Sequence, residues 1–488
     1  IYNHLLKKNI MIPPREDHDK DTQYEGAYVK DPQLGLHNWI VSFDLNSLYP
    51  HLIMQYNLSP ETLVGVQPKN MGVENYLNEK FNLQWARDKN VTVAPNGSMY
   101  RRDKQGFLPE LMEKMYGDRV VFKKKTIEAK KEFQKTKDPI YKNEISRCNN
   151  IQMAKKIALN SAYGAIGNQY FRYFDVRIAE AITLGGQLSI RWVERDVNRF
   201  MNKLLNTDNV NYVVASDTDS IYLKLDKLVE KVCKDKSPQQ ITDFINKAAE
   251  DKIQKVIDDS FKNLATYVNA YEQKMFMKRE AIANKAIWVA KKRYMMNVFD
   301  EEGIRFDIPK LKIMGVEAVK SSTPEVCRGK IKDAIRVIMN DSEDALIKFV
   351  ADFKEVFKTL SPEEVAFPRS CNYIDKYVDP NSIYKKGTPI HVKGALIYNH
   401  HILKNKLQMK YPLIKDGDKI KFLMLRQPNT VKDTVISFAT KIPYEFDLHK
   451  YVDYETQFTK TFTDPLRFVL DSIGWKLERE ATLESFFV

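Results

Sequence analysis

The chain has 488 residues, of which 43% are hydrophobic and 29% are charged, a balance typical of globular domains and unlike that of disordered chains. Lys and Arg outnumber Asp and Glu by 77 to 64, so the net charge is +13. We therefore expect a polyanionic partner, with nucleic acid favoured over an acidic membrane surface. No apolar run reaches the roughly 18 residues of a membrane span, and no membrane association is expected.

The N-terminus and the cysteines indicate how the chain is processed and where it is located. The first residue is Ile1 instead of Met, so we expect a fragment or a processed product, and no signal-peptide pattern follows it. The cysteines lie far apart, which argues against a zinc ribbon and favours reduced thiols in a cytoplasmic protein. They are Cys148, Cys233, Cys327 and Cys371.

The first predicted elements surround an aspartate. Residues 1–38 are mixed and turn-rich, which predicts a short helix followed by a connecting segment. Residues 39–43 form an apolar run typical of a buried strand, and apolar residues have helical spacing from Ser47 onward. Asp44 therefore lies at a predicted junction between a strand and a helix.

Two long helices are predicted next, over residues 109–135 and 143–165, with a break at Lys137-Asp138-Pro139. Because the connection is short, the two helices must run antiparallel and form a projecting helical hairpin. A further helix is predicted over residues 177–204.

A β-hairpin is predicted from residues 211–215 and 221–225, which flank a tight Ser-Asp-Thr-Asp-Ser turn. The rest of the chain predicts a helical stretch, three strands and a separate α+β region with two helices. These elements cover residues 238–267, 276–283, 286–290, 294–299, 325–339 and 341–360.

The predicted strand ends carry carboxylates. If the strands are neighbours in one sheet, Asp44 converges with Asp217 and Asp219, and a divalent cation can offset their repulsion. Oxygen ligands without nearby His or Cys favour Mg²⁺ or Mn²⁺ over zinc, as in two-metal nucleotidyl transfer. The Ser-Asp-Thr-Asp-Ser sequence is also ordinary turn chemistry, so by itself it favours a structural role.

The helix after Asp44 offers an anion-binding terminus. The N–H groups of Asn46, Ser47 and Leu48 open the helix and are suited to a nucleotide triphosphate. Tyr49 projects from the first turn, where its ring could pack beneath a sugar, although the periodicity alone favours a core aromatic residue.

The helical hairpin carries cations at helical spacing. Arg119 and Lys123 share one face of the first helix, and Lys156, Asn160 and the Tyr163-Gly164 pair repeat along the second. In an antiparallel hairpin these faces could point at one space and hold a triphosphate. The alternative is a solvated charged face.

These motifs, taken in order, resemble those of a known family. Asp44-Leu-Asn-Ser-Leu-Tyr-Pro50, the Lys156 to Gly164 motif and Asp217-Thr-Asp219-Ser220 are similar to motifs A, B and C of family B DNA polymerases, most closely the T-even bacteriophage replicative type. Tyr24-x-Gly26-Ala27 resembles the segment that joins the exonuclease and polymerase halves. Arg279-Glu280-Ala281-Ile282 resembles a palm segment.

The resemblance implies roles in catalysis and metal binding. Asp44 and Asp219 would ligate two Mg²⁺ ions, for which Mn²⁺ could substitute, and Leu45 would add its backbone carbonyl. Glu280 would belong to the metal site, and Asp217 would supply nearby negative charge. The catalytic residues implied in this way are Asp44, Asp217, Asp219 and Lys156.

The resemblance also implies substrate and DNA contacts. Tyr49 would exclude a ribose 2′-hydroxyl, and Tyr163 would inspect the nascent base pair. The incoming dNTP would bind Ser47, Leu48, Arg119, Lys123, Lys156 and Asn160. The primer-template DNA would contact Gly164, Lys291, Lys292, Arg293 and Tyr294. A sliding clamp would bind the C-terminal tail through Leu483, Phe486 and Phe487.

The implied fold is α+β, a right hand with an antiparallel-sheet palm, helical-hairpin fingers and an α+β thumb. The expected parts are an N-terminal connecting segment (1–15), palm (16–105 and 169–325), fingers (106–168) and thumb with clamp tail (326–488). The implied activity is DNA-directed DNA polymerisation in phage replication, in the cytoplasm of the host cell.

Several features depart from the family pattern. No convincing exonuclease Asp-x-Glu motif is found, so proofreading would need a removed segment or another chain. The helical hairpin is shorter than in T-even relatives, Ala215-Ser216 replaces a common Tyr-Gly, and Asn46 replaces a frequent Thr. Two other functions remain open: a catalytically inactive nucleic-acid-binding relative, and an RNA-synthesising or reverse-transcribing enzyme.

Overall fold

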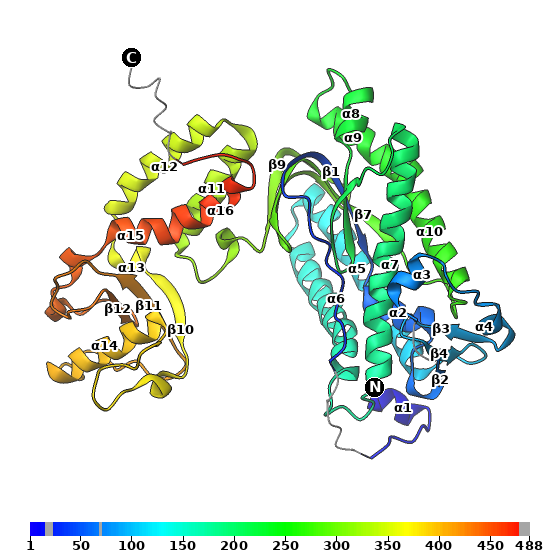
Figure 1. The fold of residues 1–488 in the computed structure, drawn as a ribbon, viewed down its shortest axis with the longest axis horizontal. Coiled ribbons are helices and arrows are strands. Elements are labelled where there is room, and N and C mark those ends of the chain that lie inside the picture. Colours follow the sequence, from blue (N-terminus) through cyan, green and yellow to red (C-terminus); the bar gives the residue numbers. More distant parts are fainter. Residues whose placement is uncertain (15–22, 68–70, 478–488) are drawn as a thin grey trace. The chain divides into compact units, whose positions relative to one another are not determined.

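The computed structural model describes residues 1–14, 23–67 and 71–477, which form two compact units (Figure 1). The described residues of the first unit come from Ile1–Gln33, Asn38–Asn284 and Phe299–Asp307, and those of the second from Leu34–His37, Lys285–Val298 and Ile308–Val488. The mixed helix and sheet content is confirmed. The palm, fingers and thumb boundaries stay predictions.

The largest sheet has the strand order β5-β6-β1-β7-β8-β9. Its strands are β1 (Gly35–Leu45), β5 (Val213–Asp217), β6 (Ser220–Lys224), β7 (Met277–Ala290), β8 (Arg293–Glu301) and β9 (Ile304–Met314). β6 lies between β5 and β1 and pairs antiparallel with both, so the predicted hairpin is joined to the strand that carries Asp44. The expected division of residues 276–290 into two strands is wrong, because β7 is continuous.

Helix α7 (Val176–Leu205) has nearly the bounds predicted for it, residues 177–204. It lies against α2 (Leu48–Tyr56). Two glycines of α7 face α2, and a side chain at Gly186 would crowd it. A Cβ at Gly185 would lie 3.4 Å from Leu52, and one at Gly186 would lie 3.3 Å from Leu48 and 3.5 Å from Tyr49. The first turn of α2 is therefore backed by the α7 backbone, which fixes where the side chains of that turn can lie.

The predicted helical hairpin consists of α5 (Phe107–Thr136) and α6 (Pro139–Ile166), which pack along each other (Figure 1). The sequence analysis placed the start of the second helix at residue 143, which was wrong. Asp138 caps α6 by accepting a hydrogen bond from the Ile140 N–H, and Pro139 takes the first helical position, where its missing N–H costs nothing.

The remaining elements complete the two units. In the first unit they are α1 (Tyr2–Lys7), β2 (Leu63–Val66), α3 (Val73–Leu77), α4 (Gln84–Asp88), β3 (Val91–Val93), β4 (Ser98–Arg101), α8 (Asp226–Val232), α9 (Pro238–Ala248), a π-helical turn (Ala249–Ile253) and α10 (Gln254–Tyr267). In the second unit they are α11 (Glu325–Asn340), α12 (Glu343–Lys358), α13 (Pro362–Val365), β10 (Phe367–Cys371), α14 (Ile390–Lys404), β11 (Asp418–Met424), β12 (Val435–Phe438), α15 (Tyr454–Phe458) and α16 (Asp464–Asp471).

The second unit is built around separate apolar clusters. Phe422 and Phe438 belong to a cluster between α14 and the β10-β11-β12 sheet, and Phe353 and Phe462 belong to another that includes α11, α12 and α16. Within the residues that the structure describes, no helix is long and apolar enough to cross a membrane. The four cysteines are buried and unpaired by disulfides.

Candidate active site

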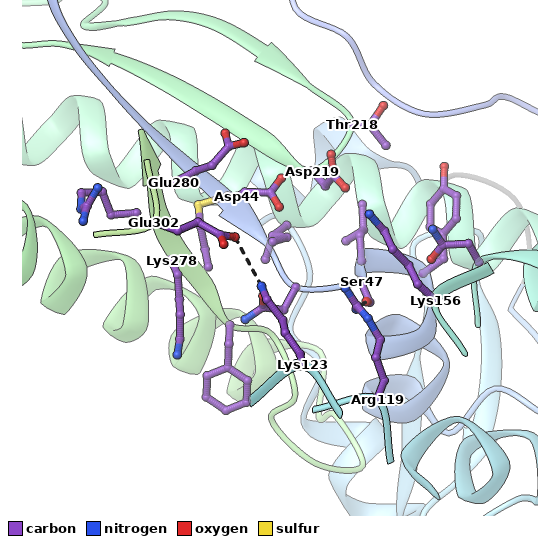
Figure 2. Close-up of a pocket in the computed structure, with 18 of the residues that line it drawn as sticks. Asp44, Ser47, Arg119, Lys123, Lys156, Thr218, Asp219, Lys278, Glu280 and Glu302 are labelled. Atoms are coloured by element: carbon purple, nitrogen blue, oxygen red, sulfur yellow. Dashed lines mark hydrogen bonds and ion pairs between the residues drawn. The ribbon is translucent and has the colours of Figure 1, made fainter. Parts of the chain in front are cut away.

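A cavity of about 1060 Å³ in the first unit collects most of the predicted site residues (Figure 2). It is lined by Asp44, Leu45, Asn46, Ser47, Leu48, Tyr49, Arg119, Lys123, Ile127, Lys156, Asn160, Tyr163, Thr218, Asp219, Glu250, Gln254, Asp258, Phe276, Met277, Lys278, Arg279, Glu280, Glu302 and Gly303. Asp44, Asp219 and Glu302 come from a strand end or turns, and the cations Arg119, Lys123 and Lys156 come from the helical hairpin.

The register of β1 and β6 brings Asp44 and Asp219 to the same place. Asp44 is paired with Ser220 across the strands, and the Leu45 N–H donates to the Asp219 carbonyl at 2.8 Å. Phe43 and Ile221, the neighbours of this edge, are fully buried. The predicted meeting of two distant strand ends is thus fixed by backbone hydrogen bonds above an apolar core.

Of the other two predicted carboxylates, one lines the cavity and one does not. Glu280 of β7 lines the cavity, where the Ser42 hydroxyl donates to its Oε2 at 3.1 Å. Asp217 does not line the cavity, and its Oδ1 accepts a hydrogen bond from the Thr218 hydroxyl at 3.1 Å. The catalytic role predicted for Asp217 therefore stays a prediction without a cavity contact to support it.

The start of α2 differs from the expected anion-binding terminus in one respect. The Asn46 N–H donates to the Phe276 carbonyl at 3.1 Å, so including this N–H in the expected cradle was wrong. Ser47 adopts a left-handed conformation with φ of 52°, and α2 begins at Leu48. Both Ser47 and Leu48 line the cavity, as does Leu45, whose carbonyl was expected to reach a metal.

Tyr49 lies between the two sides of the cavity. Its ring centroid is 4.6 Å from that of Tyr163 on α6, with the rings tilted by 47°. Burial raises the pKa of Tyr49, and the negative charge of Asp219 raises it further, so the phenol stays protonated at neutral pH. The Tyr163 hydroxyl lies 3.5 Å from that of Tyr24, which belongs to the predicted joining segment.

The hairpin cations converge on the cavity as predicted. Arg119, Lys123, Lys156 and Asn160 all line it, whereas Gly164 does not. Arg119 donates through Nη1 to the Ser47 hydroxyl at 2.7 Å, and its Nε is buried with no hydrogen-bond partner among the atoms that the structure describes. A buried donor without a partner is costly, which makes this side of the cavity suited to an anion.

Two groups of lining residues were missed by the sequence analysis. Glu250, Gln254 and Asp258 come from the π-helical turn and α10, and Glu302 and Gly303 form the turn between β8 and β9. The Glu-Gly pair was a usable signal, because a two-residue turn ending in Gly between strand-like runs is typical of a hairpin.

Of the residues expected to contact duplex DNA, Gly164 lies on α6 in the first unit, and residues 291–294 lie in the second unit, in and beside the turn between β7 and β8. Lys291 and Lys292 are exposed, and Lys292 has a φ of 60°. Arg293 lies over the Phe468 ring, and Tyr294 is buried against Trp288, with ring centroids 5.5 Å apart. Their DNA contacts stay predictions. Leu483, Phe486 and Phe487 lie outside the described residues.

The cavity offers oxygen donors for the expected metal ions. Among the residues that the structure describes, no group of three or more His, Cys, Asp or Glu side chains is arranged to hold a metal. Asp44 and Asp219 nevertheless supply hard oxygen donors from neighbouring strands, with Glu280 in the same cavity. Such a set fits Mg²⁺, which takes its remaining ligands from water and substrate phosphates.

A carboxylate-edged antiparallel sheet beside a cationic helical hairpin is an arrangement suited to nucleotides. The sequence model of DNA polymerase family B matches residues 1–473, so the chain belongs to this family.

Relatives of this family were found in phages and archaea. The chain is 32% identical, over its whole length, to the DNA-directed DNA polymerases of Enterobacteria phage T4 and Escherichia phage RB69, and it covers 59% of each. It is 26% identical to a DNA polymerase of Thermococcus gorgonarius over 97% of this chain and 51% of that protein. The chain thus spans little more than half the length of these relatives.

Proposed function

We propose that the chain is the polymerase part of a template-directed DNA polymerase, which adds dNTPs to a primer 3′-hydroxyl in phage DNA replication. The observation that carries this proposal is the single cavity that joins Asp44 and Asp219 on neighbouring strands to the cations of α5 and α6. Membership of DNA polymerase family B supports it, as do the names of the phage relatives.

The carboxylate side of the cavity is the proposed place of bond formation. Two Mg²⁺ ions bound there would lower the pKa of the primer hydroxyl and offset charge on the triphosphate and the leaving pyrophosphate. Asp44, Asp219 and the Leu45 carbonyl hold this metal site, and Glu280 adds negative charge beside it. Asp217 supports the turn through which Asp219 is presented.

The helical hairpin is the proposed binding site for the triphosphate. Arg119, Lys123, Lys156 and Asn160 contact its oxygens, together with the main chain of Ser47 and Leu48. The unpartnered Nε of Arg119 supports this assignment, because a phosphate oxygen would satisfy a donor that is already buried. Lys156 acts additionally as a catalytic residue that stabilises charge on the leaving group.

The sugar and base contacts follow from the same geometry. Tyr49 excludes the ribose 2′-hydroxyl. The Tyr163 ring packs against the Tyr49 ring, where the nascent base pair would lie. Gly164 and residues 291–294 hold the primer-template duplex through contacts to the sugar-phosphate backbone of the DNA, so binding should weaken steeply with salt. The net charge of +13 supports a polyanionic partner.

The proposal extends to partners. The tail containing Leu483, Phe486 and Phe487 binds a sliding clamp, and a 3′–5′ exonuclease is supplied by a separate domain or chain. The phage relatives support replication in the cytoplasm of a host cell. A catalytically inactive relative is the competing proposal. The presence of both strand-end aspartates, Asp44 and Asp219, argues against it, since binding alone does not need them.

Primer extension tests the proposed function. The chain should extend a primer on a DNA template when Mg²⁺ and dNTPs are supplied. Asp44→Ala and Asp219→Ala should each reduce extension by about a thousandfold or more, because several kcal/mol of transition-state stabilisation depend on the metals they hold. Duplex binding, measured by fluorescence anisotropy, should change little. A wild-type chain that binds DNA without extending it would favour the inactive relative.

A further inference from the structure

One carboxylate of the cavity reaches across to the hairpin cations. Glu302, in the turn between β8 and β9, lies with Oε1 3.3 Å from the Lys123 Nζ of α5 (Figure 2). The side chains are 58% and 45% exposed, so water and ions can reach both. Both residues line the cavity in which the triphosphate is proposed to bind.

The turn that carries Glu302 is held by a buried carboxylate. The Asp300 side chain is only 1% exposed and forms ion pairs with Arg279 and Arg305, the latter at 3.1 Å. Its Oδ1 also accepts a hydrogen bond from the Gly303 N–H at 3.0 Å. We call Asp300, Arg279 and Arg305 the Asp300 cluster.

Backbone contacts hold the same turn from the other side. The Glu302 N–H donates to the Glu280 carbonyl at 2.7 Å, which ties the turn to β7. Glu302 and Gly303 have φ values of 50° and 83°, the paired positive values of a tight hairpin turn. The Glu302 backbone is therefore fixed, while its carboxylate ends in an exposed ion pair that a ligand can replace.

The neighbouring cations are paired differently. Arg119 donates to the uncharged Ser47 hydroxyl, and Lys155, which does not line the cavity, is paired with Asp118 on the same hairpin at 2.8 Å. Lys123 instead takes a carboxylate from another element. A triphosphate carries several negative charges and can replace such a partner, whereas an exposed ion pair alone is weak.

We propose that Glu302 is a resting counter-ion for Lys123 that an incoming nucleotide triphosphate must displace, so that Glu302 lowers the affinity of the empty cavity for phosphates. This inference rests on the proposed function. Glu302 is a positioning residue, because it acts through Lys123 and not on the reacting atoms. The consequence is a site that binds its anionic substrate less tightly than its cations alone would allow.

Equilibrium binding tests this inference without turnover. The full chain is bound to a primer-template whose primer ends in a dideoxynucleotide, and dNTP affinity is titrated in Mg²⁺ at fixed ionic strength. Glu302→Gln should bind dNTP about two- to fivefold more tightly, which is the size of one exposed ion pair. Lys123→Met should weaken binding, and adding Glu302→Gln to Lys123→Met should change nothing further.

A matched control removes the same charge elsewhere. Glu132→Gln breaks an exposed pair with Lys135 on α5 outside the cavity, and dNTP affinity should stay unchanged. Equal or weaker dNTP binding by Glu302→Gln would overturn the inference, as would a gain that persists undiminished in Lys123→Met. Failure of the proposed function is distinct: the wild-type chain would then bind no dNTP on this primer-template and extend no primer.

Discussion

The two sides of the cavity are built by different means. On the carboxylate side, Asp44 and Asp219 are placed by strand pairing and by the hydrogen bond from Leu45 to the Asp219 carbonyl. On the cation side, Arg119 and Lys123 reach the cavity as long side chains on α5, each held by one polar contact, to Ser47 and Glu302.

The difference teaches which side a ligand can rearrange. Moving either strand-end aspartate would break backbone hydrogen bonds and disturb a buried core, which costs several kcal/mol. Moving a hairpin cation breaks one side-chain contact, which costs about 1 kcal/mol or less for an exposed pair. We infer that the carboxylate side is preformed and that the cation side adjusts to the nucleotide.

Removing a charge from the Asp300 cluster is the strongest test of the difference between the two sides. Asp300→Ala would leave Arg279, 9% exposed, without its buried partner, and removing one member of a buried ion pair costs about 3–5 kcal/mol. We expect the melting temperature, measured by calorimetry, to fall by about 5–10 °C. Glu302→Gln, in the same turn but exposed, should leave it nearly unchanged.

Asp333→Ala is the matched control for that measurement. Asp333 is 45% exposed and pairs with Arg336 on α11, so its removal should cost no more than about 0.5 kcal/mol. If Asp300→Ala were as mild as Asp333→Ala, the carboxylate side would not depend on a buried framework, and the contrast between the two sides would disappear.

The sequence predicted the carboxylate side better than the turns around it. Asp44 and the Asp217-Thr-Asp219 turn were recognisable because apolar runs mark buried strands that end in polar residues. Glu302 was missed because Pro309 interrupts the alternation of Ile304, Phe306 and Ile308 that follows it, and a proline within a run argues against a strand. Without that strand, the Glu302-Gly303 pair, although a usable turn signal, was not assigned to a hairpin.

Contacts between distant segments explain the remaining errors. The Asn46 N–H is taken by the carbonyl of Phe276, and no local pattern shows that residues so far apart in sequence are neighbours. The start of α6 was misplaced for a local reason, since Asp138-Pro139 was taken as a helix break when it is a capped helix start. The cation side followed from helical spacing alone.

Substitution of Tyr49 tests whether its ring, between the two sides of the cavity, is rigid. It packs on Tyr163 in front, and the α7 backbone at Gly186 lies behind it, so the ring cannot retreat from a ribose 2′-hydroxyl. Such overpacking costs about 1–3 kcal/mol, so Tyr49→Ala should reduce discrimination against ribonucleotides by about 10- to 100-fold. The measurement is the ratio of kcat/KM values for a dNTP and its ribonucleotide.

The conservative variant separates the ring from its hydroxyl. Tyr49→Phe keeps the ring and should retain most of the discrimination. An unchanged ratio in Tyr49→Ala would remove Tyr49 from the sugar site and would leave its packing on Tyr163 as a purely structural contact.

His51 gives the smallest expected effect and sharpens the picture of the cation side. It is 4% exposed, lies edge-on to Tyr116 of α5 with ring centroids 4.4 Å apart, and places Nδ1 2.9 Å from the Ser47 carbonyl. Burial lowers the pKa of His51, against the opposing effect of the Ser47 carbonyl, while Lys274 and Arg119 lower it further. The imidazole is thus held neutral beneath the residue that binds Arg119.

The sign of the pH effect follows from this lowered pKa. Below the ordinary histidine pKa of about 6.5, the unfolded chain takes up a proton at His51 that the folded chain excludes, so stability is lost as the pH falls. His51→Gln should therefore show a smaller drop in melting temperature between about pH 7.5 and 5.5 than the wild type, by roughly 1–3 °C. His400→Gln, at an exposed position on α14, is the control and should follow the wild type. If the melting temperature of His51→Gln falls with pH as much as that of the wild type, the neutral imidazole is not what supports Ser47. Arg119 is then held by its own hydrogen bond alone.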